Sequence, residues 1–147
     1  MLNRFPLHTI GDGVHLWLWG QIQVANFQGN PVEVIGSLYQ SRYISFAGDQ
    51  AASFGAFMQD KNGRMVMVFD TISSNLNPSI MVVSRKVSDS LGSIGNARFI
   101  IKGPSETFDT RWGDFEAASY DGFSANHIWV ASQYSISGDW ATFIARV

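Results

Sequence analysis

Three stretches of this chain are apolar at every position, and they constrain its fold more than any other feature. They cover residues 65–69, 80–83 and 128–131. Successive side chains of a strand point to opposite faces of its sheet, so a strand that is apolar throughout indicates a sheet covered on both faces. The connections between these stretches are too short and too polar to be crossover helices. The pattern therefore predicts antiparallel sheets stacked on one another.

Short β-branched or aromatic runs bounded by Gly, Asn, Asp or Ser recur along the chain, as is typical of strands. They predict strands at residues 14–19, 21–25, 32–38, 53–59, 64–70, 79–85, 97–101, 115–120, 127–133 and 141–147. Only residues 49–54 and 88–91 suit a helical turn, and no longer window keeps a helical period. The expected fold class is all-β.

Residues 60–63 read Asp-Lys-Asn-Gly, which predicts a tight hairpin turn because Asn and Gly tolerate positive φ. The same residues weakly resemble a calcium loop. Thr71 stands at the twelfth position, where such a loop needs a carboxylate, so the turn is the favoured interpretation.

A weak internal repeat accompanies the strands. The motif F-x-A-x-x-x-D begins at Phe54 and returns at Phe115, 61 positions later, and Arg85 is followed at the same spacing by Arg146. Repetition of a strand-turn-strand unit is typical of folds in which similar sheets are stacked.

Composition excludes several classes of function. The 147 residues suit one domain, and the absence of cysteine excludes disulfides and thiolate chemistry. A net charge of −2 leaves no basic surplus for nucleic acid. No apolar run approaches the ~18 residues of a membrane span, and residues 1–6 lack the apolar core of a signal peptide. His8, His15 and His127 have no metal-ligand spacing, so neither a metal nor another cofactor is expected.

The segment 110–119 reads Thr-Arg-Trp-Gly-Asp-Phe-Glu-Ala-Ala-Ser and is followed by Trp129 and Tyr134. With Asp-Lys-Asn-Gly-Arg-Met at 60–65 and Pro-Ser-Ile at 78–80, it resembles the R-W-G-D-[YF]-S-x-x-S segment and preceding turns of bacterial secreted β-propeller proteins of the sialidase-like, or BNR, type. The resemblance covers residues 14–147. It implies four-stranded antiparallel blades, here about two blades and part of a third in an incomplete ring (roughly 14–52, 53–110 and 111–147), and an extracellular or periplasmic location for the full-length protein.

The resemblance does not carry over an active site. The S-x-D-x-G-x-x-W motif of sialidases is absent, and no set of three substrate-binding arginines is recognisable. Arg111, Trp112, Asp114 and Glu116 are the candidate ligand contacts, because a Trp ring can stack on a sugar while Arg and acidic side chains bond its hydroxyls or carboxylate. The alternative is structural: Trp112 would pack between blades and Asp114 would accept turn amides.

A second interpretation concerns the acidic residues of the same region. Two carboxyls about 5–5.5 Å or 6.5–9.5 Å apart would support glycoside hydrolysis. The acids available for such a pair are Glu106, Asp109, Asp114, Glu116 and Asp121. In an alternating strand Asp114 and Glu116 would share a face, and the rise along the strand would place them at least ~6 Å apart.

Three functions follow. The first is a non-catalytic extracellular binding or structural propeller module with a glycan or cell-surface ligand. The second is a fragment of a sialidase-like glycoside hydrolase, and the third is a small β-barrel that holds an apolar ligand. Two blades and a part would leave apolar faces open, so we expect either further blades in a longer chain or self-association.

Overall fold

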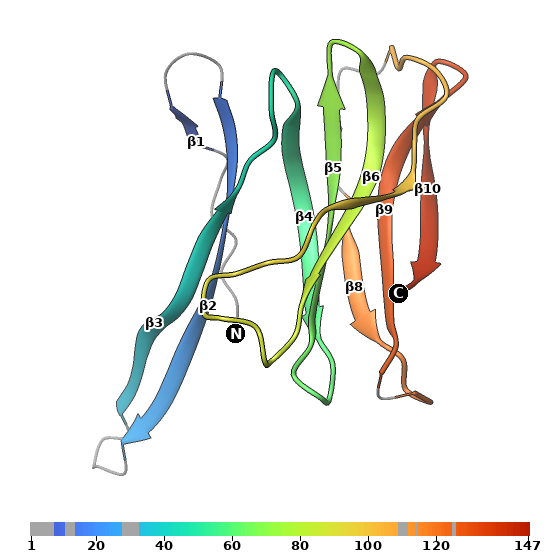
Figure 1. The fold of residues 1–147 in the computed structure, drawn as a ribbon. Coiled ribbons are helices and arrows are strands. Elements are labelled where there is room, and N and C mark those ends of the chain that lie inside the picture. The colour runs from blue at the N-terminus through green and yellow to red at the C-terminus, as the bar shows by residue number, and fades with distance from the viewer. Residues whose placement is uncertain (1–7, 11–13, 28–32, 109–111, 114, 125) are drawn as a thin grey trace.

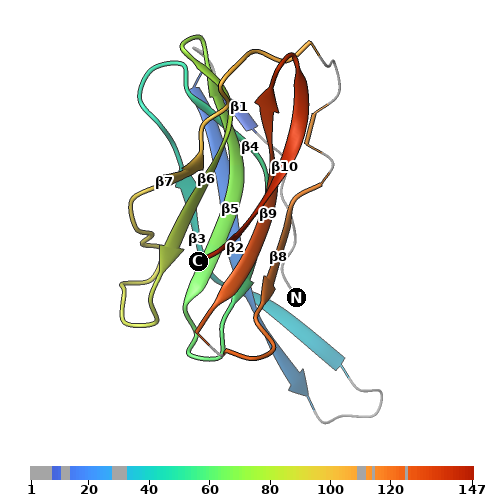
Figure 2. The same cartoon turned by 90° about the vertical axis from the view of Figure 1, so that its right-hand side faces the viewer.

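The chain forms three antiparallel β-sheets that succeed one another along the sequence and stand side by side (Figure 1). The computed structural model describes residues 8–10, 14–27, 33–108, 112–113, 115–124 and 126–147. No helix occurs among these residues, so the prediction of an all-β chain of antiparallel sheets is confirmed. Figure 2 shows the stack from its C-terminal side, with β10, β9 and β8 in front of the central sheet.

Each sheet is formed by strands that are consecutive in sequence. The N-terminal sheet contains β1 (His8–Ile10), β2 (Val14–Phe27) and β3 (Glu33–Ile44). The central sheet contains β4 (Ala51–Gln59), β5 (Met65–Ser73), β6 (Leu76–Arg85) and β7 (Arg98–Ile101). The C-terminal sheet contains β8 (Ala117–Tyr120), β9 (Ile128–Ile136) and β10 (Asp139–Arg146), with β9 in the middle.

Two local predictions are wrong. The strands expected at 14–19 and 21–25 are one strand, β2, because Gly20 stays within the ladder opposite Ser41 and a bulge between Gln21 and Ile22 absorbs the irregularity. The helical turn expected at 49–54 is the start of β4, where Ala52 pairs with Thr71 of β5. Residues 88–91 contain turns but no helix. Pairing with a neighbouring strand overrides weak local helical preference.

The central sheet packs against the N-terminal sheet through alternate residues of β5. Met67 and Phe69 are fully buried on this side and belong to a cluster that includes Trp19 and Ile44 of the N-terminal sheet. Each large apolar side chain buried in this way contributes about 1.5–3 kcal/mol to the free energy of unfolding.

The other face of the central sheet packs against the C-terminal sheet. Val66 and Val68, which alternate with Met67 and Phe69 along β5, belong to a second cluster with Ile128 and Val130 of β9. The apolar runs 65–69 and 80–83 are therefore covered on both sides, as their composition predicts.

The third apolar run, 128–131, departs from the prediction because its Trp129 face is not covered by another sheet. Trp129 is 43% exposed and points away from the central sheet, with the Arg146 guanidinium 6.0 Å from its ring centroid. Ile144 is 64% exposed. The rings of Phe115 and Trp140 stack with their centroids 6.1 Å apart. We call Trp129, Trp140 and Ile144 the C-terminal end face.

The N-terminal sheet also has an apolar outer face. Trp19 points inward, so Gly20 faces outward, and a methyl group added there would lie 3.6 Å from Leu38. Leu38 is 65% exposed, and Val24 and Tyr43 are exposed as well. We call Val24, Leu38 and Tyr43 the N-terminal end face. The stack is thus apolar at both ends.

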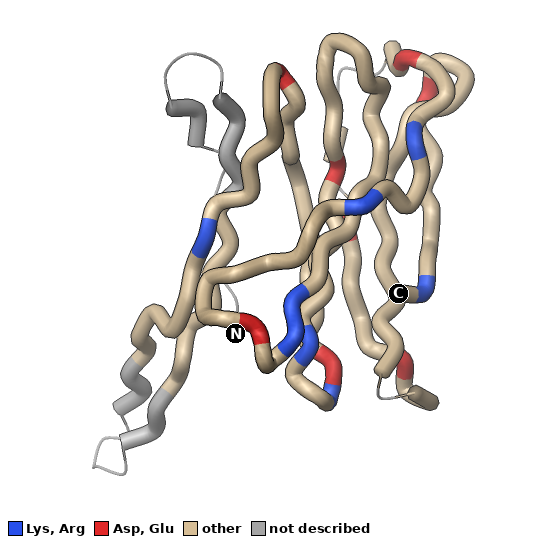
Figure 3. Tube along the Cα trace, viewed as in Figure 1, with Lys and Arg blue, Asp and Glu red and all other residues tan. Residues whose placement is uncertain are grey.

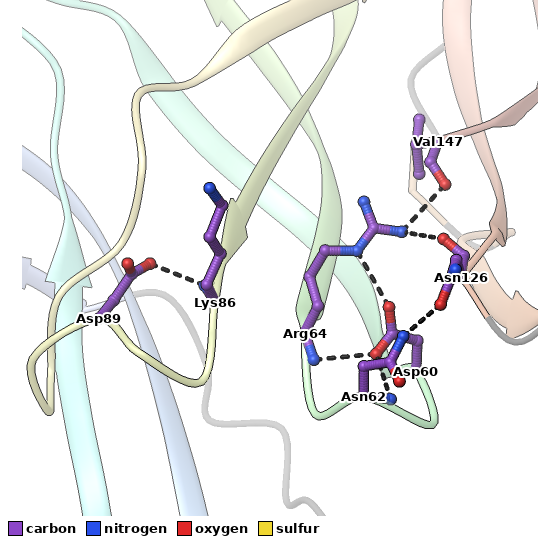
Figure 4. A network of polar contacts seen from close by, with 7 residues as sticks. All are labelled: Asp60, Asn62, Arg64, Lys86, Asp89, Asn126 and Val147. Atoms are coloured by element: carbon purple, nitrogen blue, oxygen red, sulfur yellow. Dashed lines mark hydrogen bonds and ion pairs between the residues drawn. The ribbon is translucent and has the colours of Figure 1, made fainter.

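The hairpin predicted at residues 60–63 is confirmed, and it joins two sheets (Figure 4). Asp60 Oδ1 accepts the backbone N–H groups of Asn62 and Arg64 at 2.9 Å each, and its Oδ2 pairs with Arg64 Nε at 3.1 Å. Arg64 Nη2 donates to the carbonyls of Asn126 (2.6 Å) and Val147 (3.3 Å) in the C-terminal sheet region. The Asp60 carboxylate therefore stabilises the turn and orients Arg64, which bonds the hairpin to the C-terminal sheet region.

The internal repeat relates residues with the same structural role in one pair, Asp60 and Asp121, but not in another, Arg85 and Arg146. Asp60 and Asp121 each follow a strand, and each accepts the backbone N–H two residues ahead, so they are equivalent turn residues. Arg85 pairs with Met65 and points toward the N-terminal sheet, whereas Arg146 pairs with Trp129 on the outer face. The two arginines therefore have different environments.

Among the residues that the structure describes, none belongs to a helix long and apolar enough to cross a membrane.

Candidate functional site around Asp70 and Trp112

A carboxyl group lies inside the interface between the central and C-terminal sheets. Asp70 follows Val66 and Val68 on the same face of β5, and it is only 2% exposed. Its Oδ1 accepts a hydrogen bond from the Ser132 hydroxyl of β9, and its Oδ2 accepts the indole N–H of Trp112 at 2.7 Å. Both carboxylate oxygens are thus bonded to side chains from distant parts of the sequence.

Burial raises the pKa of Asp70 from 3.8 to about 7, because desolvation disfavours the charged carboxylate. The hydrogen bonds from Ser132 and Trp112 act in the opposite direction without offsetting the burial. The negative charge of Glu116 adds a smaller upward contribution. The group consequently changes its charge near neutral pH.

Trp112 and Gly113 bring the loop between β7 and β8 onto the central sheet. The Gly113 N–H donates to Gln133 Oε1 at 3.0 Å, and its φ is 90°. A Cβ at this position would lie 2.1 Å from Phe54 Cδ2, so only glycine fits. The Trp-Gly pair in the sequence is therefore required by a contact with β4.

Phe54 is the extra residue of a bulge in β4. Its neighbours Ser53 and Gly55 pair with Asp70 and Phe69, and Phe54 has a φ of 39°. Positive φ is uncommon for a bulky residue and concentrates at sites where the backbone is held in place for a function. The bulge turns the Phe54 ring outward, where it is 46% exposed.

These side chains enclose a pocket of about 270 Å³ at the edge of the sheet interface. Its walls include the rings of Phe54 and Trp112, the Asp70 carboxyl, Pro78 and Thr107. Thr71 also contributes, but its hydroxyl donates to the Ala51 carbonyl and accepts from Gln50, each at 2.9 Å. The pocket therefore presents two aromatic rings and one polar corner.

Of the four candidate ligand contacts named from the sequence, the structure places two. Trp112 lines the pocket, and half-buried Glu116 lies close enough to affect the charge of Asp70. Arg111 and Asp114 lie outside the described residues.

The acidic residues considered for glycoside hydrolysis are dispersed. Asp109 and Asp114 lie outside the described residues, and Glu106 is exposed. Asp121 accepts the Phe123 N–H at 2.9 Å, and this bond lowers the pKa of its carboxyl. β8 begins at Ala117, so Glu116 lies just before the strand, and the expectation that it shares a strand face with Asp114 involves a residue outside the described part of the chain.

Sequence reasoning missed the central residue of the site. Asp70 directly follows the apolar run 65–69, and a carboxyl at the end of a fully covered strand was a usable signal. Ser132 and Phe54 carried no such signal, because their roles depend on a bond across the sheet interface and on a bulge.

Comparison of the chain with protein-family models, with curated proteins and with solved structures finds no match.

Proposed function

We propose that the chain is a non-catalytic extracellular binding module built from propeller-type sheets, and that it binds a glycan in the pocket beside Trp112. The observation that carries the proposal is the pairing of two aromatic rings, Phe54 and Trp112, around one polar corner. Ligand sites combine apolar walls with a few polar groups in this way.

The propeller assignment draws support from the stacking of the sheets. The central sheet is covered on both faces by other antiparallel sheets, and both ends of the stack are apolar. Propeller blades pack in this manner, and further sheets would cover the end faces.

A sugar suits the pocket in size and chemistry. The volume of about 270 Å³ is just below the usual range of about 300–1,000 Å³ for small-molecule sites, which leaves room for about one ring. The apolar face of a sugar would stack on Phe54 or Trp112, and its hydroxyls would reach the polar corner.

Asp70 favours binding over catalysis. Its two oxygens already accept bonds from Ser132 and Trp112, so it is a positioning residue for the pocket wall. Glycoside hydrolysis would require a carboxyl free to transfer a proton to the substrate.

One observation favours the alternative of a glycoside hydrolase. A carboxyl with a pKa near 7 beside a second acid, Glu116, is the pattern of a general acid. Hydrolysis of chromogenic glycosides that is lost in both Asp70→Asn and Glu116→Gln would support this alternative and contradict a non-catalytic role.

Binding is tested by saturation-transfer NMR and calorimetry with a panel of methyl glycosides. We expect at least one glycoside to bind the wild type, and Trp112→Ala and Phe54→Ala to weaken its binding at least ten-fold. Trp140→Ala, which removes a ring from the C-terminal end face, is the matched control and should bind normally. Failure of every glycoside, or equal binding by Trp112→Ala, would contradict the proposal.

A further inference from the structure

A second pocket, of about 370 Å³, lies on the opposite side of the central sheet, between it and the N-terminal sheet. Its walls include three glutamines, one arginine and two apolar side chains: Gln21, Gln23, Gln59, Arg85, Val87 and Leu91. This site is independent of the pocket beside Trp112.

Arg85 is buried in this region and forms no ion pair with a described residue. It ends β6, on the same face as Met81 and Val83, and it is 6% exposed. Its Nη2 donates to the Asp89 carbonyl at 2.9 Å, while its buried Nε has no hydrogen-bond partner in the described part of the chain. The one ion pair found there joins Arg64 and Asp60. A buried cation without a paired anion is costly, so the site favours an anionic partner.

The surrounding loop holds the Arg85 guanidinium in place. The Asp89 carboxylate accepts the Lys86 N–H at 2.7 Å, which closes the turn after β6 (Figure 4). A Cβ added to Gly63 would lie 2.3 Å from Val87, so the neighbouring hairpin packs directly on this loop. Figure 3 shows Lys and Arg residues at this end of the central sheet, interspersed with acidic residues. The arginine is therefore positioned before any ligand arrives.

Glutamine amides add neutral donors. Gln40 Nε2 donates to Gln21 Oε1 at 2.6 Å, which uses the carbonyl of Gln21 and leaves its amide nitrogen as a donor. Among the described lining residues none is acidic. The pocket is positively charged, with donors on one side and apolar groups at its rim.

We infer that this pocket binds the carboxylate of a small amphipathic molecule. Arg85 pairs with the carboxylate, because a planar guanidinium matches its two oxygens. The amides of Gln21 and Gln59 supply further donors, and Val87 and Leu91 contact the apolar part of the ligand.

The test compares hexanoate with its neutral isostere hexanamide, by NMR titration of the full chain in low-chloride buffer. We expect the wild type to prefer hexanoate at least ten-fold, or about 1.4 kcal/mol. Arg85→Gln should abolish the preference. Arg98→Gln removes an exposed arginine on β7 and should preserve it. Circular dichroism and thermal melts of each variant confirm folding.

A second variant keeps the test decisive if Arg85→Gln does not fold. Leu91→Asp changes an exposed rim residue and places a carboxylate beside the pocket. Loss of the leucine contact should weaken the binding of both probes, and repulsion between carboxylates should weaken hexanoate binding further, so the preference for hexanoate should fall. Equal affinity of the wild type for both probes, absence of saturable hexanoate binding, or an unchanged preference in Leu91→Asp would overturn the inference. Glycoside binding at the pocket beside Trp112 is measured separately, so failure of one proposal can be distinguished from failure of the other.

Discussion

The indole N–H of Trp112 lies 2.7 Å from Oδ2 of Asp70, 42 positions earlier in the chain. This bond attaches the loop before β8 to the middle of the central sheet. It also explains why a carboxyl is retained inside an otherwise apolar interface, since Asp70 has two donors within reach, from Trp112 and Ser132. Buried polar groups persist where their bonds are satisfied.

The raised pKa of Asp70 makes stability depend on pH. The native carboxyl, with a pKa of about 7 against an ordinary 3.8, binds its proton more tightly than the unfolded chain does. The contribution of Asp70 to the free energy of unfolding is therefore fully present below about pH 4 and is lost as pH rises through about 7. The total loss is on the order of 4 kcal/mol. Asp70→Asn has no such titration, and its amide can still accept from Trp112 and donate to Ser132.

We therefore expect Asp70→Asn to match the wild type near pH 4 and to exceed it in stability at pH 8, as measured by urea unfolding across this range. Other titrating groups are common to both proteins, so the difference isolates Asp70. Parallel stability curves for the two proteins would contradict the assignment.

Replacement of Trp112 by Phe removes the donor while it keeps an aromatic ring. We expect a loss of about 1–3 kcal/mol at pH 8, where the carboxylate is charged, and a smaller loss at pH 5. The matched control is Trp140→Phe at an exposed position, which should stay within about 0.5 kcal/mol of the wild type. A double-mutant cycle with Asp70→Asn measures the coupling, and zero coupling would show that the bond contributes nothing.

Gly113→Ala tests the contact between the loop and β4. The new methyl would overlap the Phe54 ring and the backbone has a φ of 90°, so we expect a loss of at least about 2 kcal/mol. Gly122→Ala, with no atom within 4 Å of its added Cβ, is the control and should be nearly neutral. The double variant Gly113→Ala/Phe54→Ala removes the overlap with the ring and keeps the backbone strain. The part of the stability that it recovers therefore measures the steric cost, and calorimetric melts provide the measurement.

The two apolar end faces predict head-to-tail association of isolated chains. Leu38→Lys should block the N-terminal end face and Ile144→Lys the C-terminal end face, because each puts a charge on an exposed apolar surface. Each variant alone should be monomeric by light scattering. An equimolar mixture should form a heterodimer through the two intact faces. A monomeric wild type, or a mixture that does not associate, would show that these faces do not bind each other.

Much of the fold followed from local patterns. The run 65–69 predicted a strand covered on both faces, and Asp60-Lys61-Asn62-Gly63 predicted a hairpin, because both depend on side-chain alternation or turn geometry within a few residues. The run 128–131 looks the same in sequence, yet Trp129 is exposed. Whether a partner sheet covers an apolar strand depends on the rest of the assembly.

The residues of the candidate site also fall into two groups, those that a local motif pointed to and those whose roles depend on the tertiary structure. Trp112 and Glu116 were named as ligand contacts from a short motif, whereas Asp70 was not named and Phe54 was noted only as part of the internal repeat. Phe54 obtained its role from a bulge, which no local residue type demands.

By itself, the sequence determined that this chain forms antiparallel strands with tight polar turns, since the period of apolar residues and the turn chemistry are properties of neighbouring residues. Only the tertiary structure decided that Asp70 meets Ser132 and Trp112 and that Arg85 is buried without an ion pair to any described carboxylate. These contacts involve residues far apart in the sequence, and the packing of the sheets and of the loop before β8 sets the distances between them.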